Sequence, residues 1–477
     1  MRALDGLGVF WLSGYKEDAL SGRLQFDPKD GGINLSLVGT FDNAPDDGDG
    51  GEPKIRIIGW IGKDKVTLDR CFSRGPTIRS FGVAESKYYA NRMFIGHHFD
   101  KGELTFQSAT VALGHLDSWV GRSGITKEDS LRDPSAPSTI YKMSFTPLLE
   151  ESHPFSHGRL ILDFAWESRG DPIHGIAFQQ WPVVRIEYDQ MQTFDVVYKD
   201  VSRVQNLMTL CIDAPAAIDT LILRRPDVRE KMLSGEDSPY EQAIEFVAPP
   251  LRYVEPQERK PRHLHQMLLS FEELGGIAAI ARWLDASRRF QRALDSFMSI
   301  KHAKQMFTEN RFLNVTFAAE AFHRTTQNLP YMDEEGFTRL LNVYLENTPE
   351  EHHDWLRGKI RNEPPLRKRL QQLAIRSGEA TRQLIGEKGR WAYTVSRVRN
   401  ELSHLGDNSR FSGSDLSFLA ESVYAVVRIC MLIECGVPPE ILINKANSPT
   451  INWYRERLTE SIERVQRQLS NPLIASA

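Results

Sequence analysis

The chain has 477 residues, of which 41% are apolar and 26% are charged. This length exceeds what one ordinary hydrophobic core holds, so two or three domains are expected. The composition is that of a globular protein and excludes a disordered or fibrous chain. A net charge of −4 at pH 7 excludes a molecule that is basic over its whole surface, so attraction to nucleic acid requires a local patch.

The thiols and the apolar segments favour a cytoplasmic protein that does not enter a membrane. The four cysteines form no Cys-x-x-Cys pair and have no histidines at zinc-finger spacing, so neither a disulfide framework nor a structural zinc site is predicted. Asp5 interrupts the first residues, which lack the hydrophobic region of a signal peptide. The longest apolar segment, residues 423–433, contains Arg428 and is shorter than the roughly 20 residues of a membrane span.

Residues 8–250 contain short segments rich in β-branched and aromatic residues, separated by Gly, Pro, Asp and Asn. Hydrophobic and polar residues alternate in these segments, which is typical of half-buried strands. The predicted strands include residues 9–12, 33–38, 55–60, 104–106, 141–145, 160–164 and 183–188. We therefore predict an antiparallel β-rich domain at residues 1–250, with a sandwich or barrel-like architecture, closed by a short helix at 202–210.

Prolines and charged residues at 251–262 predict a linker, because proline lacks a backbone donor and disfavours helix in the residue before it. At residues 263–477, hydrophobic residues recur at the i, i+3, i+4 spacing of amphipathic helices. Two such sets are Leu264, Met267, Leu268 and Phe271, and Phe337, Leu340, Leu341 and Tyr344. The pattern predicts an all-α bundle, and with the front domain an α+β multidomain protein.

One helical segment ends in Arg399-Asn400-Glu401-Leu402-Ser403-His404. Its predicted inward stripe consists of Val395, Val398, Leu402 and Leu405. Arg399 and Ser403 are one i, i+4 pair and Asn400 and His404 are another, so these four side chains share one surface. A permanent cation, an amide and an imidazole on one surface are suited to chemistry on a phosphodiester.

An Arg five residues before a His is weak evidence by itself, since a chain with 13 histidines is expected to hold such a pair by chance. The simpler alternative is a solvated face whose terminal His⁺ is favoured by the helix macrodipole. The preceding segment supports a functional interpretation, because residues 356–399 hold 12 Lys and Arg against 3 acids. That local balance of +9 predicts a patch able to hold phosphates.

The motif resembles the signature of HEPN-domain ribonucleases, an Arg and a His separated by four to six residues, in its common Arg-Asn form. The front of the chain resembles the N-terminal domain of ApeA-type antiphage proteins. That second resemblance is carried by residues 8–12, 21–24, 35–39, 95–99 and 117–119. Together the two resemblances span nearly the whole chain and imply an antiphage protein with a C-terminal HEPN nuclease domain.

The resemblance implies an endoribonuclease that uses neither a metal nor another cofactor. The RNA 2′-hydroxyl attacks the adjacent phosphorus and leaves 2′,3′-cyclic phosphate and 5′-hydroxyl ends. His404 would be the general acid or base, since an imidazole titrates near neutrality. Arg399 would neutralise charge on the non-bridging oxygens through its planar fork of donors. Asn400 would orient the His or the phosphate.

An acidic residue on an earlier helix accompanies the motif in related domains, and Glu320 is the candidate here. Its apolar neighbours in the sequence suggest a partly buried helix, where a carboxylate needs a partner such as Arg399. A surface pair of Glu320 with Arg324, at i, i+4, is the open alternative.

The resemblance also implies partners. One motif supplies one His, and the family brings two motifs together by dimerisation, so a homodimer through the HEPN domain is expected. The ApeA resemblance implies abortive infection, in which cellular RNA, with tRNA as the expected target, is cut after a phage-derived trigger is detected by the front domain. The alternative is a non-catalytic module in which the HEPN-like bundle serves dimerisation and the binding of nucleic acid or protein.

Overall fold

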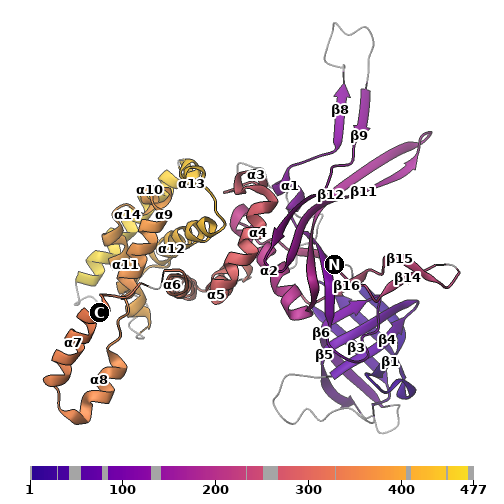
Figure 1. Ribbon diagram of the computed structural model, residues 1–477, viewed down its shortest axis with the longest axis horizontal. Coiled ribbons are helices and arrows are strands. Elements are labelled where there is room, and N and C mark those ends of the chain that lie inside the picture. The colour runs from indigo at the N-terminus through magenta and orange to yellow at the C-terminus, as the bar shows by residue number, and fades with distance from the viewer. Residues whose placement is uncertain are drawn as a thin grey trace, which may run out of the picture. The chain divides into compact units, whose positions relative to one another are not determined.

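The computed structural model describes residues 3–29, 31–41, 55–77, 84–129, 141–232, 234–250, 267–303, 305–327, 329–403, 410–446 and 449–470. The chain forms two compact units, residues 1–284 and 285–477, which we call the β-rich unit and the helical unit. Figure 1 shows the elements of each. The linker expected at 251–262 lies outside the described residues.

The first six strands of the β-rich unit close into a barrel (Figure 1). They are β1 (Leu4–Leu12), β2 (Leu20–Asp27), β3 (Gly32–Val38), β4 (Ile55–Ile61), β5 (Asp64–Thr77) and β6 (Glu85–Ile95). Neighbouring strands are antiparallel, and the pairing of β5 with β6 completes the ring. Alternate side chains such as Leu24 and Phe26 are buried in one hydrophobic core, so the barrel is filled by its own side chains.

An open layer of strands continues from β6. Its order outward is β16 (Ile244–Val247), β13 (Ile218–Arg224), β7 (Thr105–Leu113), β12 (Gly175–Thr193), β11 (Gly158–Asp171) and β10 (Glu151–Phe155). Helix α2 (Phe194–Ile212) packs against β7 and β12 and buries its apolar face there. Two further hairpins are β8–β9 (Ile125–Asp129 and Tyr141–Phe145) and β14–β15 (Arg229–Lys231 and Asp237–Glu241).

The predicted antiparallel β-rich architecture is confirmed, and the barrel-like form is the observed one. The predicted strand segments fall inside observed strands to within one residue, but β1, β7, β11 and β12 extend well beyond them. The short helix predicted at 202–210 is observed as the longer α2. It begins at Phe194 because the mixed aromatic and β-branched residues of 194–201 also pack one helical face onto the sheet.

The helix predicted from Leu264, Met267, Leu268 and Phe271 is wrong for the described part of that segment. Helix α3 (Phe271–Leu274) begins only at Phe271 and is followed by α4 (Gly276–Ser287). Ser270 accepts a hydrogen bond from the Glu273 backbone while the Glu273 side chain accepts one from Ser270, and this capping box fixes the helix start. The Leu268 N–H instead donates to the Cys211 carbonyl at the end of α2, at 2.8 Å.

Two adjacent histidines follow β6 after Gly96. The ring of His98 lies 5.3 Å from that of Trp11 and 4.9 Å from that of Trp60, and its Nε2 is 2.8 Å from the Gly59 carbonyl oxygen. Burial lowers the pKa of His98. Burial, assisted by Lys65 and Arg225, lowers the pKa of His97 to about 4. Both rings are therefore neutral in the folded protein at pH 7.

Acidification is expected to destabilise the β-rich unit through His97. In the unfolded chain this residue binds a proton below its ordinary pKa of 6.5, whereas the folded chain keeps it neutral down to about pH 4. The unfolded state gains the proton first, so stability falls as the pH drops between these values. His97→Gln, which cannot protonate, should flatten the pH dependence of the thermal midpoint over this range. Equal falls in the variant and the wild type would contradict this assignment.

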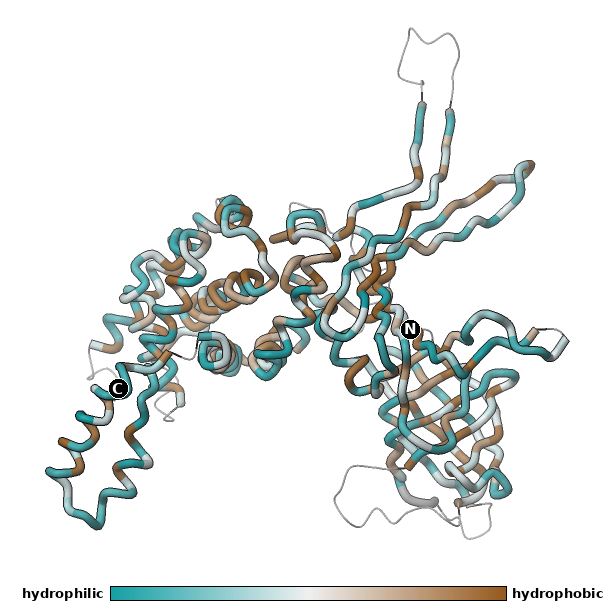
Figure 2. Tube along the Cα trace, in the orientation of Figure 1, coloured by the Kyte–Doolittle hydropathy of each residue, from teal (hydrophilic) through white to brown (hydrophobic). Residues whose placement is uncertain are grey.

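The helical unit is a bundle built around α12 (Gly413–Glu434), which confirms the predicted all-α domain. Its neighbours are α6 (Thr308–Thr326), α9 (Leu366–Ser377), α10 (Glu379–Ile385) and α14 (Pro449–Ser470). The unit also contains α5 (Gln291–His302), α11 (Lys388–Ser403) and α13 (Pro439–Ala446). Figure 2 shows apolar residues gathered along α12 in the middle of the unit.

Among the described helices, α12 is the one whose length and composition would allow it to cross a membrane. Its apolar window is 67% buried inside the unit. Core helices of soluble proteins show the same combination of length and hydropathy. Packing against four neighbouring helices accounts for the apolar composition of α12.

Helices α7 (Glu334–Glu346) and α8 (His353–Lys359) form a hairpin inserted between α6 and α9. The helix predicted from Phe337, Leu340, Leu341 and Tyr344 is confirmed as α7. Its expected burial in the bundle is wrong, because Leu340 and Tyr344 are exposed. The period of the pattern identified the helix, but not the surface that its apolar face meets.

Candidate functional site

The predicted motif lies at the end of α11, which packs against α6, α9 and α14. Trp391, Val395, Val398 and Leu402 are buried and set the orientation of this helix. Arg399 is left partly exposed and Asn400 exposed. His404 and Leu405 lie outside the described residues.

Arg399 reaches from α11 to α6. Its Nη2 lies 3.8 Å from Glu320 Oε2, and its guanidinium carbon lies 5.2 Å from the ring centre of Phe317. Its Nη1 donates to Asn400 Oδ1 at 3.3 Å. Its Nε is buried without a hydrogen-bond partner among the described residues. A guanidinium has five N–H donors, so these contacts engage only part of its capacity.

Glu320 is shared between two arginines. Its Oε1 lies 3.2 Å from Nη2 of Arg324, one turn further along α6, while Oε2 faces Arg399. Both arrangements considered for Glu320 from the sequence are therefore present together. The contact with Arg324 is within reach of a weak hydrogen bond and the contact with Arg399 is not, so Arg324 is the closer partner.

The ion pairs continue from Arg324 into the interior of the unit. Arg324 also lies 2.9 Å from Glu363, which accepts a hydrogen bond from Arg369 of α9 at 2.8 Å. Arg369 is only 3% exposed, donates from Nε to the Pro364 carbonyl at 2.8 Å, and lies 3.3 Å from His323 Nδ1. Burial lowers the pKa of both Arg369 and His323. Alternating charges thus link Arg399 at the surface to a buried arginine.

Three residues of the network around Arg399 were not singled out from the sequence. Glu363 and Arg369 join the network only because α6 packs against α9, and no spacing along the chain predicts that contact. Phe317 is the exposed ring beneath Arg399. The sequence feature that points to Phe317 is its position one turn before Glu320, on the same face of α6.

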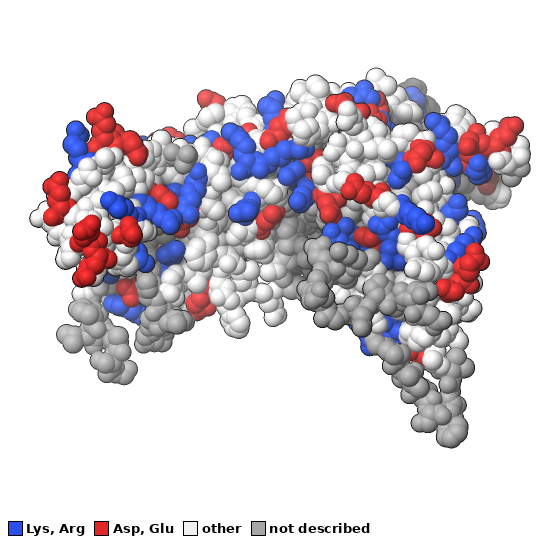
Figure 3. All heavy atoms as spheres, turned by 60° about the horizontal axis from the view of Figure 1, so that its bottom comes forward, with Lys and Arg blue, Asp and Glu red and all other residues white. Residues whose placement is uncertain are grey.

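The basic segment 356–399 carries less uncompensated charge in the folded unit than along the sequence. Arg376 pairs with Glu434, Arg390 lies 3.8 Å from Glu463, and Arg397 lies 3.5 Å from Glu401. Two of these acids lie beyond the segment on α12 and α14. Figure 3 shows Lys and Arg interspersed with Asp and Glu over the helical unit, at left, on the face in view.

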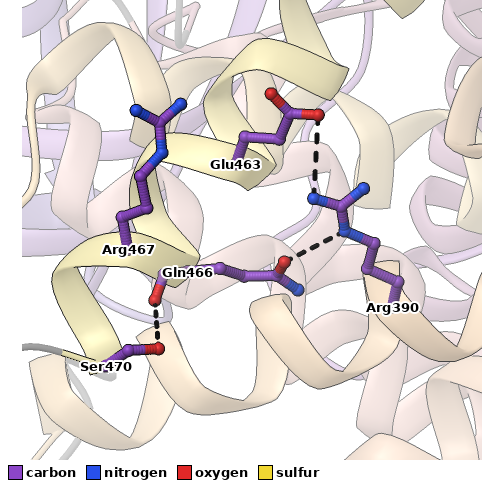
Figure 4. Close-up of a pocket in the computed structure, with 5 residues that line it drawn as sticks. All are labelled: Arg390, Glu463, Gln466, Arg467 and Ser470. Carbon is purple, nitrogen blue, oxygen red and sulfur yellow. Dashed lines mark hydrogen bonds and ion pairs between the residues drawn. The ribbon is translucent and has the colours of Figure 1, made fainter.

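An open pocket of about 440 Å³ lies between α11 and α14. It is lined by Arg390, Glu463, Gln466, Arg467 and Ser470 (Figure 4). Arg390 Nε donates to Gln466 Oε1 at 3.0 Å across it. Arg390 precedes Arg399 by nine residues, which places the two side chains on opposite sides of α11. The pocket is therefore separate from the surface that carries Arg399.

No group of three His, Cys, Asp or Glu residues able to hold a metal ion occurs in the part of the chain that the structure describes. The two carboxylates nearest Arg399 along the network, Glu320 and Glu363, are surrounded by guanidinium groups. These positive charges oppose the binding of a further cation.

Two family models match the chain. The model described as ApeA N-terminal domain 1 matches residues 7–283, and the model described as Apea-like HEPN matches residues 313–441. All four predicted site residues, Glu320, Arg399, Asn400 and His404, lie within the second match. No match was found among curated proteins or among solved structures.

HEPN domains are generally nucleases, commonly dimerise and act on RNA. The ApeA model alone spans more than half of the chain. The chain therefore belongs to the ApeA family, as an ApeA-type protein with a C-terminal HEPN domain.

Proposed function

We propose that this protein is a metal-independent HEPN endoribonuclease that acts in antiphage defence. The observation that carries the proposal is Arg399, five residues before His404, which is partly exposed, is held by an ion pair of 3.8 Å, and has one donor, Nε, that no described residue engages. An RNA phosphate is an acceptor that fits this group, because its oxygens match the planar fork of the guanidinium.

In the proposed reaction the RNA 2′-oxygen forms a bond to the adjacent phosphorus while the bond to the 5′-oxygen breaks. One His404 removes the 2′-hydroxyl proton, and a proton is delivered to the departing 5′-oxygen. Arg399 stabilises the negative charge on the non-bridging oxygens. Asn400, hydrogen-bonded to Arg399 at 3.3 Å, orients the guanidinium. The products carry 2′,3′-cyclic phosphate and 5′-hydroxyl ends.

Two copies of the chain supply the two proton carriers. In-line transfer uses a base and an acid on opposite sides of the phosphorus, whereas each chain has one motif histidine. We assign them to a homodimer through the HEPN domain, whose twofold axis brings two α11 ends to one RNA strand. Phe317, exposed beside Arg399, adds an aromatic surface on which an unpaired base can stack.

In the cell we place the protein in the cytoplasm, where it would cut host RNA, with tRNA as the target, and stop the growth of an infected cell. A nuclease that damages host RNA must be restrained before infection. We assign this restraint to the β-rich unit, as the sensor or regulator of a phage-derived trigger, since the proposed site residues all belong to the helical unit.

The test is growth and RNA-end analysis after expression, with and without phage, for the wild type and His404→Ala. The wild type should produce 5′-hydroxyl ends in the presence of a chelator, and His404→Ala should produce none while it stays folded and dimeric. Ends that persist in the variant, or cleavage that stops when divalent ions are removed, would overturn the proposal. A wild type that binds RNA without cutting it would instead support the non-catalytic binding module.

The position of Glu320 between two arginines leads to a prediction about activity. Arg324→Gln removes the closer partner of Glu320, so the carboxylate is expected to turn to Arg399 and neutralise it. A new charge-assisted hydrogen bond of this kind should lower kcat about 10-fold. Adding Glu320→Gln removes the carboxylate and should restore most of that loss. Initial rates on a labelled RNA oligonucleotide measure both effects. A double variant no faster than Arg324→Gln would contradict the neutralisation of Arg399 by Glu320.

A further inference from the structure

The α7–α8 hairpin has an apolar face that no other described helix of its unit covers. In Figure 1 the hairpin extends away from the bundle. Among the described residues of its two helices only Leu345 is buried. Val343 and Tyr344 of α7 are 54% and 50% exposed, and Trp355 of α8 is 64% exposed. Leu340, 37% exposed, lies three and four residues before Val343 and Tyr344, so these three side chains share one face of α7. An exposed apolar patch of this kind indicates an interaction site.

The root of the hairpin is held by specific bonds. Asn362 Oδ1 accepts from the Met332 N–H at 3.1 Å, and its Nδ2 donates to the Met332 carbonyl at 3.0 Å. Asp333 caps α7 by accepting from the Gly336 N–H at 2.7 Å. A defined projection of two short helices is marginally stable in water without a partner for its apolar face. The bonds at the root present that face in a fixed direction.

The hairpin also carries a net negative charge. Its cations between residues 333 and 359 are Arg339 and, in the last turn of α8, Arg357 and Lys359. The acids of this stretch are Asp333, Glu334, Glu335, Glu346, Glu350, Glu351 and Asp354. Near the turn that joins the helices, Glu346 and Glu350 form no ion pair with any described residue. Such a surface repels RNA and attracts a basic protein surface.

A surface of complementary character lies on the same unit. Arg367 of α9 lies over the ring of Tyr393 of α11 at 5.2 Å, and both side chains are exposed. Arg367 and the exposed Lys388 form no ion pair within the described ranges. The acid beside them, Glu387, accepts from the backbone N–H groups of Gly389 and Arg390, and these bonds, with the charges of Lys388 and Arg367, lower its pKa. An acidic, apolar projection and a basic, aromatic surface on one chain are the two halves of a self-association contact.

We propose that the α7–α8 hairpin of one chain docks on the surface formed by Arg367, Lys388 and Tyr393 of a second copy. In a twofold pair the contact forms twice, once for each hairpin. The inference rests on the pairing of HEPN units in the proposed function, and it names a surface that would hold the pair together. The apolar residues Val343, Tyr344 and Trp355 supply the buried area, and the acidic end sets the orientation.

Sedimentation velocity of the full-length chain over a concentration series tests the apolar part of the contact. Tyr344→Ser combined with Trp355→Ser should weaken self-association at least 10-fold, since two large side chains lose their burial. Trp453→Ser is the matched control, because Trp453 on α14 is 51% exposed and lies outside the proposed surface. Its self-association should equal that of the wild type.

Charge reversal identifies the occupant. Glu346→Lys with Glu350→Lys, and separately Arg367→Glu with Lys388→Glu, should each weaken the dimer. The chain carrying all four changes should regain it, which also shows that the variants fold. An unchanged sedimentation mass in the apolar variant would overturn the inference, whether the hairpin then contacts the β-rich unit, RNA or another protein. A fourfold variant that does not recover the dimer would also overturn it. A monomeric wild type would overturn the dimer of the proposed function as well, whereas a wild-type dimer indifferent to these changes would overturn the inference alone.

Discussion

Arg399→Ala is expected to lower RNA cleavage at least 10²-fold and to leave the helical unit folded. The guanidinium would stabilise charge that develops on the phosphate, and no other described cation shares its place beside Asn400. Its role in folding is small, since an ion pair of 3.8 Å and a contact with the exposed ring of Phe317 contribute about 1 kcal/mol. Arg399→Lys should not restore cleavage, because an ammonium lacks the planar pair of donors.

Arg397→Ala is the matched control for this prediction. Arg397 lies two residues earlier on α11 and pairs with Glu401 at 3.5 Å on the exposed side of the helix. Its loss removes the same charge from the same element without touching Glu320 or Asn400. Single-turnover cleavage of a labelled oligonucleotide, with circular dichroism as the check on folding, compares the two variants. Equal losses of rate would mean that the general basic charge of α11, rather than the position of Arg399, supports cleavage.

The strands of the barrel were predictable because each one buries alternate residues. In β2, Leu24 and Phe26 are buried while Arg23 and Gln25 are exposed, and this period of two is visible in the sequence. Closure was not predictable, because it depends on β5 pairing with β6 while β6 also pairs with β3. Those pairings join segments whose registers are set by the packed core, so the sequence left a sandwich and a barrel as alternatives.

The arrangement around Arg399 was predictable only as far as residue types and a family resemblance reach. Glu320 was chosen as a partner for Arg399 from its apolar neighbours, and the two side chains do lie near one another on separate helices. The competition from Arg324 was considered as an alternative, whereas the structure has both contacts at once. A sequence gives candidate pairs. That Glu320 lies closer to Arg324, at 3.2 Å, than to Arg399, at 3.8 Å, depends on how α11 packs on α6.

Charge counted along the chain was a poor guide to charge in space. Residues 356–399 carry 12 cations against 3 acids, yet Arg376 and Arg390 meet carboxylates of α12 and α14. A helical bundle brings segments far apart in sequence side by side, so a local count overstates the field of any one segment. The cations that no described acid pairs with, such as Arg367 and Lys388, are the better candidates for contacts with another molecule.

Arg369→Ala is expected to lower the free energy of unfolding of the helical unit by about 1–3 kcal/mol. The side chain is 3% exposed and donates to the Pro364 carbonyl and to Glu363, each at 2.8 Å. Its removal leaves a cavity between α6 and α9 and takes away the donor of a buried carbonyl. Hydrogen exchange followed by mass spectrometry on peptides of α6 and α9 reports this unit separately from the β-rich unit.

Arg382→Ala is the control, with the same change of residue at an exposed site. Arg382 pairs with Glu379 at 2.7 Å across one turn of α10, and its side chain is 73% exposed. Solvent screens such a pair, so exchange in α6 and α9 should stay at the wild-type rate. If both variants accelerate exchange to the same extent, the burial of Arg369 is not what stabilises the unit. Faster exchange in Arg369→Ala alone would show that the buried interior end of the network holds α6 against α9.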